Sequence, residues 1–173
     1  MTTPIQASAA NQDLGDRLAG KYMTFKLANE EYGLQILRVR EIIGLMDITR
    51  VPRTPEFIRG VINLRGKVIP VIDMRQKFAM EKVETTDQTV IIVVQHDVGT
   101  HSLTMGILVD QVLEVLSIAA SQIEPAPSFA ETSLDTEFIL GVGKSEKRVI
   151  FLLDIGRVLN PHETHQLASV AAA

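Results

Sequence analysis

The chain contains two copies of one sequence unit, and this internal repeat restricts the possible folds more than any other feature. Shifting the chain so that Gly60–Met74 lies on Gly141–Ile155 needs no gap, and five positions are then identical. A second shift places Gly33–Ile43 on Gly106–Leu116 and preserves a glycine, a valine and a glutamate. Chance similarity between short apolar strands is the alternative, but order and spacing agree over most of each half. We therefore expect two similar substructures.

Each copy consists of short β-strand patterns separated by turn residues. Tyr22–Leu27 alternates, and the segments TVIIVVQ, LTMGILVD, KVIPVIDM and RVIFLLDI are rich in β-branched or aliphatic residues. Strand signals that recur about every ten residues favour small barrels or sandwiches over an α/β sheet. Because proline cannot donate to a ladder, Pro70 should lie at an edge or a bulge. Helical signals are few: Thr54–Gly60 predicts one turn, and DIGRVLNPHE predicts a short C-terminal helix.

The repeat and the composition of the chain ends divide it into four segments. We expect a flexible segment over residues 1–20, a first barrel over 21–86, a second barrel over 87–156, and a short helix and tail over 157–173. A unit of roughly 65 residues has little core of its own, so the two units should pack together. That packing would leave a groove and a shared interface between them. The predicted fold class is all-β.

Charge and composition argue against several classes of protein. The net charge of −4 disfavours nucleic-acid binding, which normally uses a basic face. The chain has no cysteine, so disulfide and thiol chemistry are excluded. No apolar run approaches the roughly 18–20 residues that span a bilayer, and the N-terminus lacks the pattern of a secretory signal. We expect a cytoplasmic protein that is not itself inserted in the membrane.

No combination of residues predicts catalysis. The segment LGVGKS resembles part of a phosphate-binding loop, but Phe138 stands where that loop needs glycine. The segment HETH lacks the spacing of zinc proteases, and His96 and His101 have no cysteine or clustered acidic partners. Asp73 and Asp154 recur at strand ends, where aspartate commonly accepts hydrogen bonds from local N–H groups. We therefore expect no enzymatic activity, no metal site and no cofactor.

The two copies differ at the turn that joins their last strand pair. The turn is NLRG in the first copy and KSEK in the second. In the first copy Gly66 frees the backbone beside Arg65, so the guanidinium should point outward. A guanidinium is suited to carboxylates and backbone carbonyls. A solvated charge on a hairpin is the alternative, and the turn by itself does not decide between the two.

Long strings of the sequence resemble the CheW family of bacterial chemotaxis coupling proteins. The strings are EEYGLQILRVREI, RVPRTPEFIRGVINLRGKVIPVIDMRQKF and GILVDQVLEVLSIAASQIEPAP, and the resemblance covers about Lys21 to Pro161. It implies two five-stranded SH3-like β-barrels packed on a common core. It also implies an adaptor that couples chemoreceptor signalling tips to the histidine kinase CheA, without enzymatic activity or a cofactor.

The resemblance further implies two partner surfaces. The chemoreceptor's cytoplasmic helical hairpin would bind a groove between the barrels at the matching positions Val39, Glu41, Asn63 and Arg65. There Val39 would supply apolar floor, and Glu41 and Arg65 would supply rims of opposite sign. The regulatory domain of CheA would contact barrel ends, at Ile123, Pro125 and Phe129 and on a second surface from Ile42 to Val51. The family often carries a basic residue where this chain has Glu124.

Other interpretations stay open on the sequence. A nucleic-acid-binding barrel would need aromatic side chains and a basic groove, but the chain has no tryptophan and two tyrosines. An unrecognised enzyme would need a convergent cluster of titratable residues. The chain could also be a regulatory module of another two-component system, or a coupling module of a larger protein. A stand-alone coupling protein is the simplest of the adaptor interpretations.

Overall fold

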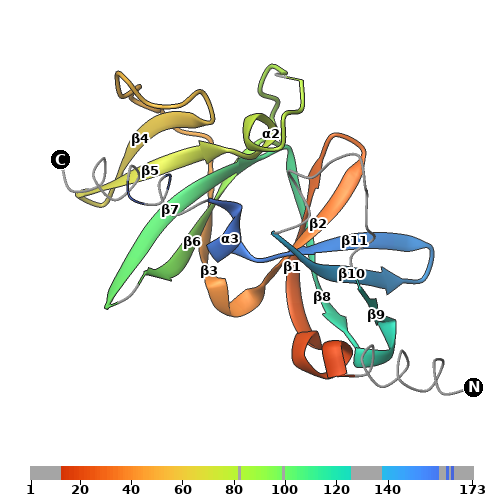
Figure 1. Cartoon of the computed structure of the whole chain (residues 1–173). Helices are drawn as coiled ribbons and strands as arrows, with labels where there is room; N and C mark the ends of the chain where they lie inside the picture. Colours follow the sequence, from red (N-terminus) through yellow and green to blue (C-terminus); the bar gives the residue numbers. More distant parts are fainter. Residues whose placement is uncertain are drawn as a thin grey trace, which may run out of the picture.

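The computed structural model describes residues 13–81, 83–98, 100–125, 138–159, 163 and 165. These residues form two β-sheets and a few short helices (Figure 1). The strands are β1 (Gly20–Leu27), β2 (Glu30–Gln35), β3 (Val39–Gly44), β4 (Ile58–Leu64), β5 (Lys67–Asp73), β6 (Val90–Val98), β7 (His101–Val109), β8 (Gln111–Ile118), β9 (Ile123–Glu124), β10 (Ile139–Ser145) and β11 (Arg148–Leu153). The short helices are η1 (Ile36–Arg38), α2 (Met74–Lys77), η2 (Ala120–Gln122) and α3 (Ile155–Val158).

The strand order confirms that the two copies of the repeat form equivalent strand arrangements. One sheet has the order β8-β1-β2-β11-β10-β9, and the other has the order β3-β6-β7-β5-β4. In each sheet the last strand of a repeat lies between its antiparallel hairpin partner and a parallel neighbour: β5 between β4 and β7, and β11 between β10 and β2. The repeat aligns Val68–Ile72 with Val149–Leu153, and these segments hold equivalent positions in the two sheets.

The two sheets do not coincide with the expected ranges 21–86 and 87–156. The hairpin β1–β2 of the first repeat joins β8 to β11 of the second repeat, and β6–β7 of the second repeat joins β3 to β5 of the first. Each sheet is thus built by exchange of the first hairpin between repeats. The strand patterns of the two copies are alike, so the sequence permits pairing within or between repeats, and the short η1 connection carries the chain across to the other sheet.

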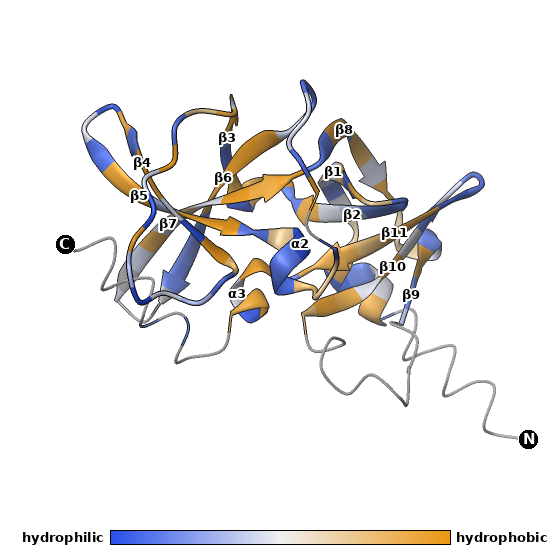
Figure 2. Cartoon of the chain, turned by 90° about the horizontal axis from the view of Figure 1, so that it is seen from above, coloured by the Kyte–Doolittle hydropathy of each residue, from blue (hydrophilic) through white to orange (hydrophobic). Residues whose placement is uncertain are grey.

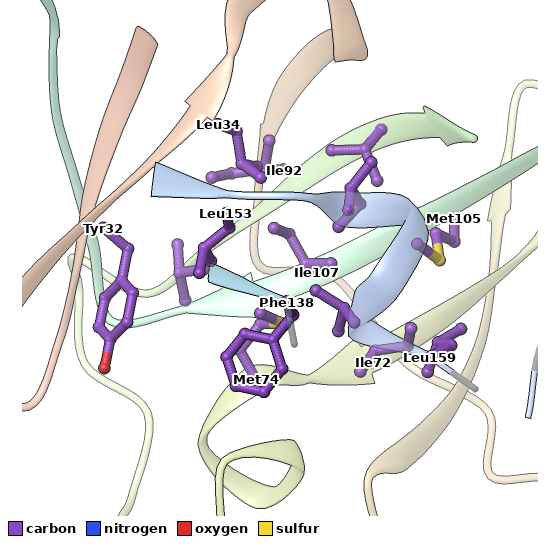
Figure 3. Close-up of a cluster of buried hydrophobic side chains, with 14 of the residues drawn as sticks. Tyr32, Leu34, Ile72, Met74, Ile92, Met105, Ile107, Phe138, Leu153 and Leu159 are labelled. Atoms are coloured by element: carbon purple, nitrogen blue, oxygen red, sulfur yellow. The ribbon is translucent and has the colours of Figure 1, made fainter. Parts of the chain in front are cut away.

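The apolar core is divided into one large cluster between the sheets and one smaller cluster for each sheet. The large cluster takes side chains from both sheets, among them Leu34, Ile107 and Leu153 (Figure 3). Phe78 and Phe138 stack in this region with ring centroids 4.6 Å apart. Each fully buried aliphatic side chain contributes about 1.5–3 kcal/mol relative to exposure. The expectation that the two units pack on each other is confirmed.

Aspartates cap the two short helices that follow the last strand of each repeat. Asp73 accepts hydrogen bonds from the backbone N–H groups of Arg75 and Gln76 at the start of α2. Asp154 accepts one from Gly156 N–H at 2.9 Å at the start of α3. The local role predicted for these recurring aspartates is therefore confirmed.

Three local expectations have different outcomes. The turn predicted over Thr54–Gly60 forms only in part: Ile58 N–H bonds to Pro55 O at 3.0 Å, but Thr54 Oγ1 donates backward to Val51 O at 2.8 Å, and Gly60 lies within β4. Pro70 follows the prediction, because it pairs with β4 and the ladder with β7 begins only at Val71. Residues 13–18 are helical and Leu18 packs in the core beneath β1, so this part of the N-terminal segment is anchored rather than flexible.

Candidate functional site

The turn between β4 and β5 holds an arginine in an unusual backbone conformation. Arg65 has φ 52° and Gly66 has φ 86°, the pattern of a tight two-residue hairpin turn. Asn63 Oδ1 accepts a hydrogen bond from Gly66 N–H at 2.9 Å and fixes this turn. Glu146 has φ 56° at the equivalent turn of the second repeat, so the two hairpins share this turn conformation. The hydrophilic hairpin tip projects from the molecule (Figure 2).

Arg65 forms an ion pair with Glu41 on the opposite edge of the same sheet. The guanidinium donates through Nη2 to Glu41 Oε1 and through Nη1 to Glu41 Oε2, the latter at 3.4 Å. The Arg65 side chain is 71% exposed and the Glu41 side chain 31%. The hydrogen bond and the charge of Glu41 raise the pKa of the Arg65 guanidinium. Glu41 and Arg65 therefore form one paired corner, rather than the two separate rims expected across a groove.

The contact between Glu41 and Arg65 also means that the five-stranded sheet curls on itself. Strands β3 and β4 are its two edges, yet their residues meet at this corner. Ile43 of β3 and Leu64 of β4 pack on the same apolar cluster inside the curl. Of the four expected receptor-binding residues, Asn63 joins this corner. Val39 instead packs half-buried against the core between the sheets, before a bulge in β3.

The expected kinase-binding residues differ in their accessibility. Ile42 is exposed on β3 and Val51 is half-buried in the connection that follows. Leu45, which the sequence did not single out individually, is also exposed there. Ile123 is only 3% exposed and packs in a core cluster, so its side chain is not a surface contact. Pro125 is exposed, and Phe129 lies outside the described residues.

Glu124 forms an ion pair with a lysine of the neighbouring strand. Lys144 Nζ on the adjacent strand β10 donates to Glu124 Oε1 at 2.8 Å, and both side chains are about half exposed. A neighbouring lysine therefore balances part of the negative charge at this edge.

A second charged cluster occupies the equivalent edge of the six-stranded sheet. Arg148 Nη1 donates to Glu114 at 2.5 Å, and its Nε donates to Glu31 at 3.0 Å. These bonds raise the pKa of the Arg148 guanidinium. The cluster lines a shallow hollow of about 430 Å³ that also includes Lys26. The repeat places Glu114 on Glu41, but no sequence signal indicated that Arg148 would hold two carboxylates.

A buried hydroxyl supports this second cluster. Thr24 is completely buried at a bulge of β1, where its Oγ1 donates to Glu114 O at 2.6 Å and accepts from Glu114 N–H at 3.1 Å.

We expect Thr24→Val to lower the free energy of unfolding by about 1–3 kcal/mol, because both backbone groups of Glu114 lose their partner. Thr24→Ser keeps the hydroxyl and should be clearly milder in chemical denaturation. Equal losses in the two variants would contradict this assignment.

The described part of the chain presents several possible binding surfaces. Among the described residues, no group of three or more His, Cys, Asp or Glu side chains is placed to hold a metal ion. No helix in the described ranges is long and apolar enough to cross a membrane. Exposed apolar side chains and paired charges lie on β-sheet edges and hairpin tips. These features define a β-sheet protein suited to binding other proteins.

Comparison with known proteins identifies the family. The family model of the CheW-like domain matches residues 21–163. The chemotaxis protein CheW of Klebsiella aerogenes is 43% identical over 157 residues, which are 91% of this chain and 92% of that protein. The chemotaxis protein CheW of Bacillus subtilis is 34% identical and covers 81% of this chain and 86% of its own length.

A solved structure agrees with the sequence comparisons. The scaffolding protein TtCheW from Thermoanaerobacter tengcongensis superposes with a TM-score of 0.73 at 37% identity, covering 84% of this chain and 96% of that one. The chain belongs to the CheW-like family.

Proposed function

We propose that the chain is a chemotaxis adaptor that couples the cytoplasmic tips of chemoreceptors to the histidine kinase CheA. Its similar relatives are chemotaxis proteins, and the solved relative is a scaffolding protein. The observation that carries the assignment of a site is Arg65, which is exposed at a hairpin tip and paired with Glu41. A regulatory module of another two-component system is not favoured by these relatives.

The receptor side of the proposed adaptor is the corner formed by Glu41, Asn63 and Arg65, with Val39 on the same strand as Glu41. A helical hairpin would place its apolar face against the partly buried valine and its polar groups against the charged corner. The exposed guanidinium keeps donors that are free to bind a carboxylate or carbonyl of the partner. Because Asn63 bonds to the turn, it acts by holding Arg65 in place.

The kinase side of the proposed adaptor uses two other edges. On the five-stranded sheet, Ile42 and Leu45 present apolar surface beside Val51. On the six-stranded sheet, Pro125 is exposed after β9, and Phe129 follows in the chain. Ile123 would support this second edge from the core. We propose that the regulatory domain of CheA binds these edges, and that the adaptor itself catalyses no reaction and needs no cofactor. The proposed adaptor is cytoplasmic and associates with membrane chemoreceptor arrays through its partners.

The proposal is tested by separating the two partner surfaces. Ile42→Ser and Phe129→Ser should each weaken binding of the isolated kinase regulatory domain by about tenfold or more, since an apolar contact is lost from a partner interface. Binding of a receptor hairpin fragment and the melting temperature should stay close to wild type. A large fall in melting temperature for Phe129→Ser would instead identify a core residue, because truncating a buried phenylalanine costs about 3–5 kcal/mol.

A further inference from the structure

The chain crosses between the two sheets at two equivalent connections that differ in what they expose. The repeat shift that places Gly33 on Gly106 also places Leu37 on Asp110. Asp110 lies between β7 and β8, where its carboxylate accepts hydrogen bonds from Arg75 Nε at 2.7 Å and from Ala28 N–H at 2.8 Å. Leu37 lies in η1 between β2 and β3 and is 95% exposed. The β7–β8 connection is therefore hydrogen-bonded to neighbouring elements through Asp110, whereas the β2–β3 connection exposes Leu37 to solvent.

The turn that carries Leu37 is closed by a backbone hydrogen bond and lies between two paired strands. Val39 N–H bonds to Ile36 O across η1. Arg38 Nη1 lies 3.8 Å from Asp97 Oδ2 at the end of β6, and Ser102 Oγ donates to the same carboxylate at 2.8 Å. The flanking strands β2 and β3 each pair with a neighbouring strand. A side chain presented on such a turn has little backbone freedom to lose when a partner binds.

We propose that Leu37 is an apolar anchor for the chemoreceptor's helical hairpin, an inference that rests on the proposed function. Single exposed apolar residues are common on proteins. Leu37 differs because it is almost fully exposed, it lies in a hydrogen-bonded turn, and only Arg38 separates it from the strand that carries Val39 and Glu41. The Arg38–Asp97 pair beside it supplies a polar border. An apolar anchor with a polar border is the usual anatomy of a binding hot spot, and the apolar face of an amphipathic helix is its matching partner.

The first test compares Leu37→Ala with Val149→Ala by titration with a receptor hairpin fragment. Leu37→Ala should weaken binding about tenfold, which corresponds to about 1.4 kcal/mol. Val149 is also an exposed aliphatic residue, on β11, and the β10–β11 hairpin tip lies away from β3 in both views (Figures 1 and 2). Its variant should bind like wild type. Both variants should melt like wild type, because each change removes exposed surface.

The second test uses the absence of cysteine from the chain. Leu37→Cys and Val149→Cys each provide a single attachment point for an environment-sensitive fluorophore. Adding the receptor fragment should shift the emission of the label at position 37 to the blue, and should leave the label at position 149 unchanged. The isolated kinase regulatory domain should shift neither label.

The outcomes separate this inference from the proposal on which it rests. If wild type binds the receptor fragment, while Leu37→Ala binds equally well and the label at position 37 does not respond, Leu37 is not an anchor and the adaptor proposal stands. A blue shift at position 37 with the kinase domain alone would assign Leu37 to the other partner and overturn the inference. If wild type does not bind the receptor fragment at all, both the adaptor proposal and the anchor fail together.

Discussion

Gly60→Ala is expected to lower the free energy of unfolding by about 3 kcal/mol or more, a large effect for a single added methyl group. Gly60 has φ +145°, a conformation that other residues rarely adopt, and a Cβ atom there would lie 2.1 Å from Thr49 O. Thr49 and Val61 exchange backbone hydrogen bonds of 2.8 Å beside this glycine. The added methyl group would therefore push apart the bridge that anchors the connection before β4. Chemical denaturation measures the loss.

Two other glycines provide matched controls for Gly60→Ala. A Cβ atom added at Gly44 would meet no atom within 4 Å, and its φ is not unfavourable, so Gly44→Ala should change stability by less than about 1 kcal/mol. Gly66 has φ +86° but open space, so Gly66→Ala should be intermediate and report the backbone strain alone. If Gly60→Ala is as mild as Gly44→Ala, the close approach of Thr49 is not a constraint on the fold.

Arg65→Glu is expected to weaken receptor binding more than any other surface change, by roughly 30-fold or more, a loss typical of a binding hot spot. The new carboxylate would face Glu41 and repel it, and the donors offered to the partner would be lost. Arg65→Ala and Glu41→Ala should each weaken binding less. Titration with a receptor hairpin fragment measures the binding, and thermal melting reports the stability of each variant.

Arg65→Asn separates the binding role of this residue from its structural role. Asparagine tolerates the left-handed conformation, and an ion pair this exposed adds little to stability because solvent screens it. The variant should therefore melt close to wild type and still bind the receptor weakly. Glu146 is the matched control, because it has φ 56° at the equivalent turn of the second repeat. Glu146→Asn should keep wild-type binding. Unchanged binding by a folded Arg65→Glu variant would make Arg65 a solvated turn residue, and a collapse in melting would make it structural.

The fold class could be predicted because its signals are local or repeated. Short strand patterns, the recurring aspartates and Pro70 all behave as their residue types predict. The exchange of hairpins between repeats could not be predicted, because β1–β2 and β6–β7 carry equivalent patterns and each fits either sheet. The turn expected from Thr54 is limited to one hydrogen bond, from Ile58 N–H to Pro55 O, because the chain enters β4 at Ile58.

The candidate site could be predicted only in part. The sequence identified Arg65 as an exposed residue at a turn, and its resemblance to a family connected this residue with Glu41 and Asn63. The direct contact between Arg65 and Glu41 depends on the curl of the sheet, which brings its two edges together and could not be predicted from the sequence. The burial of Ile123 could also not be predicted from the sequence, because an aliphatic residue suits a core and an interface equally well.

Recruitment of the kinase to receptors tests the adaptor account most directly. Receptor signalling fragments can be fixed to a surface, and binding of the CheA regulatory domain to them can be measured with and without this chain. We predict that the kinase domain is retained only when the wild-type chain is present, and that Arg65→Glu abolishes retention while still binding the kinase domain in solution. Retention of the kinase domain at the same level without the chain, or with Arg65→Glu, would contradict the account.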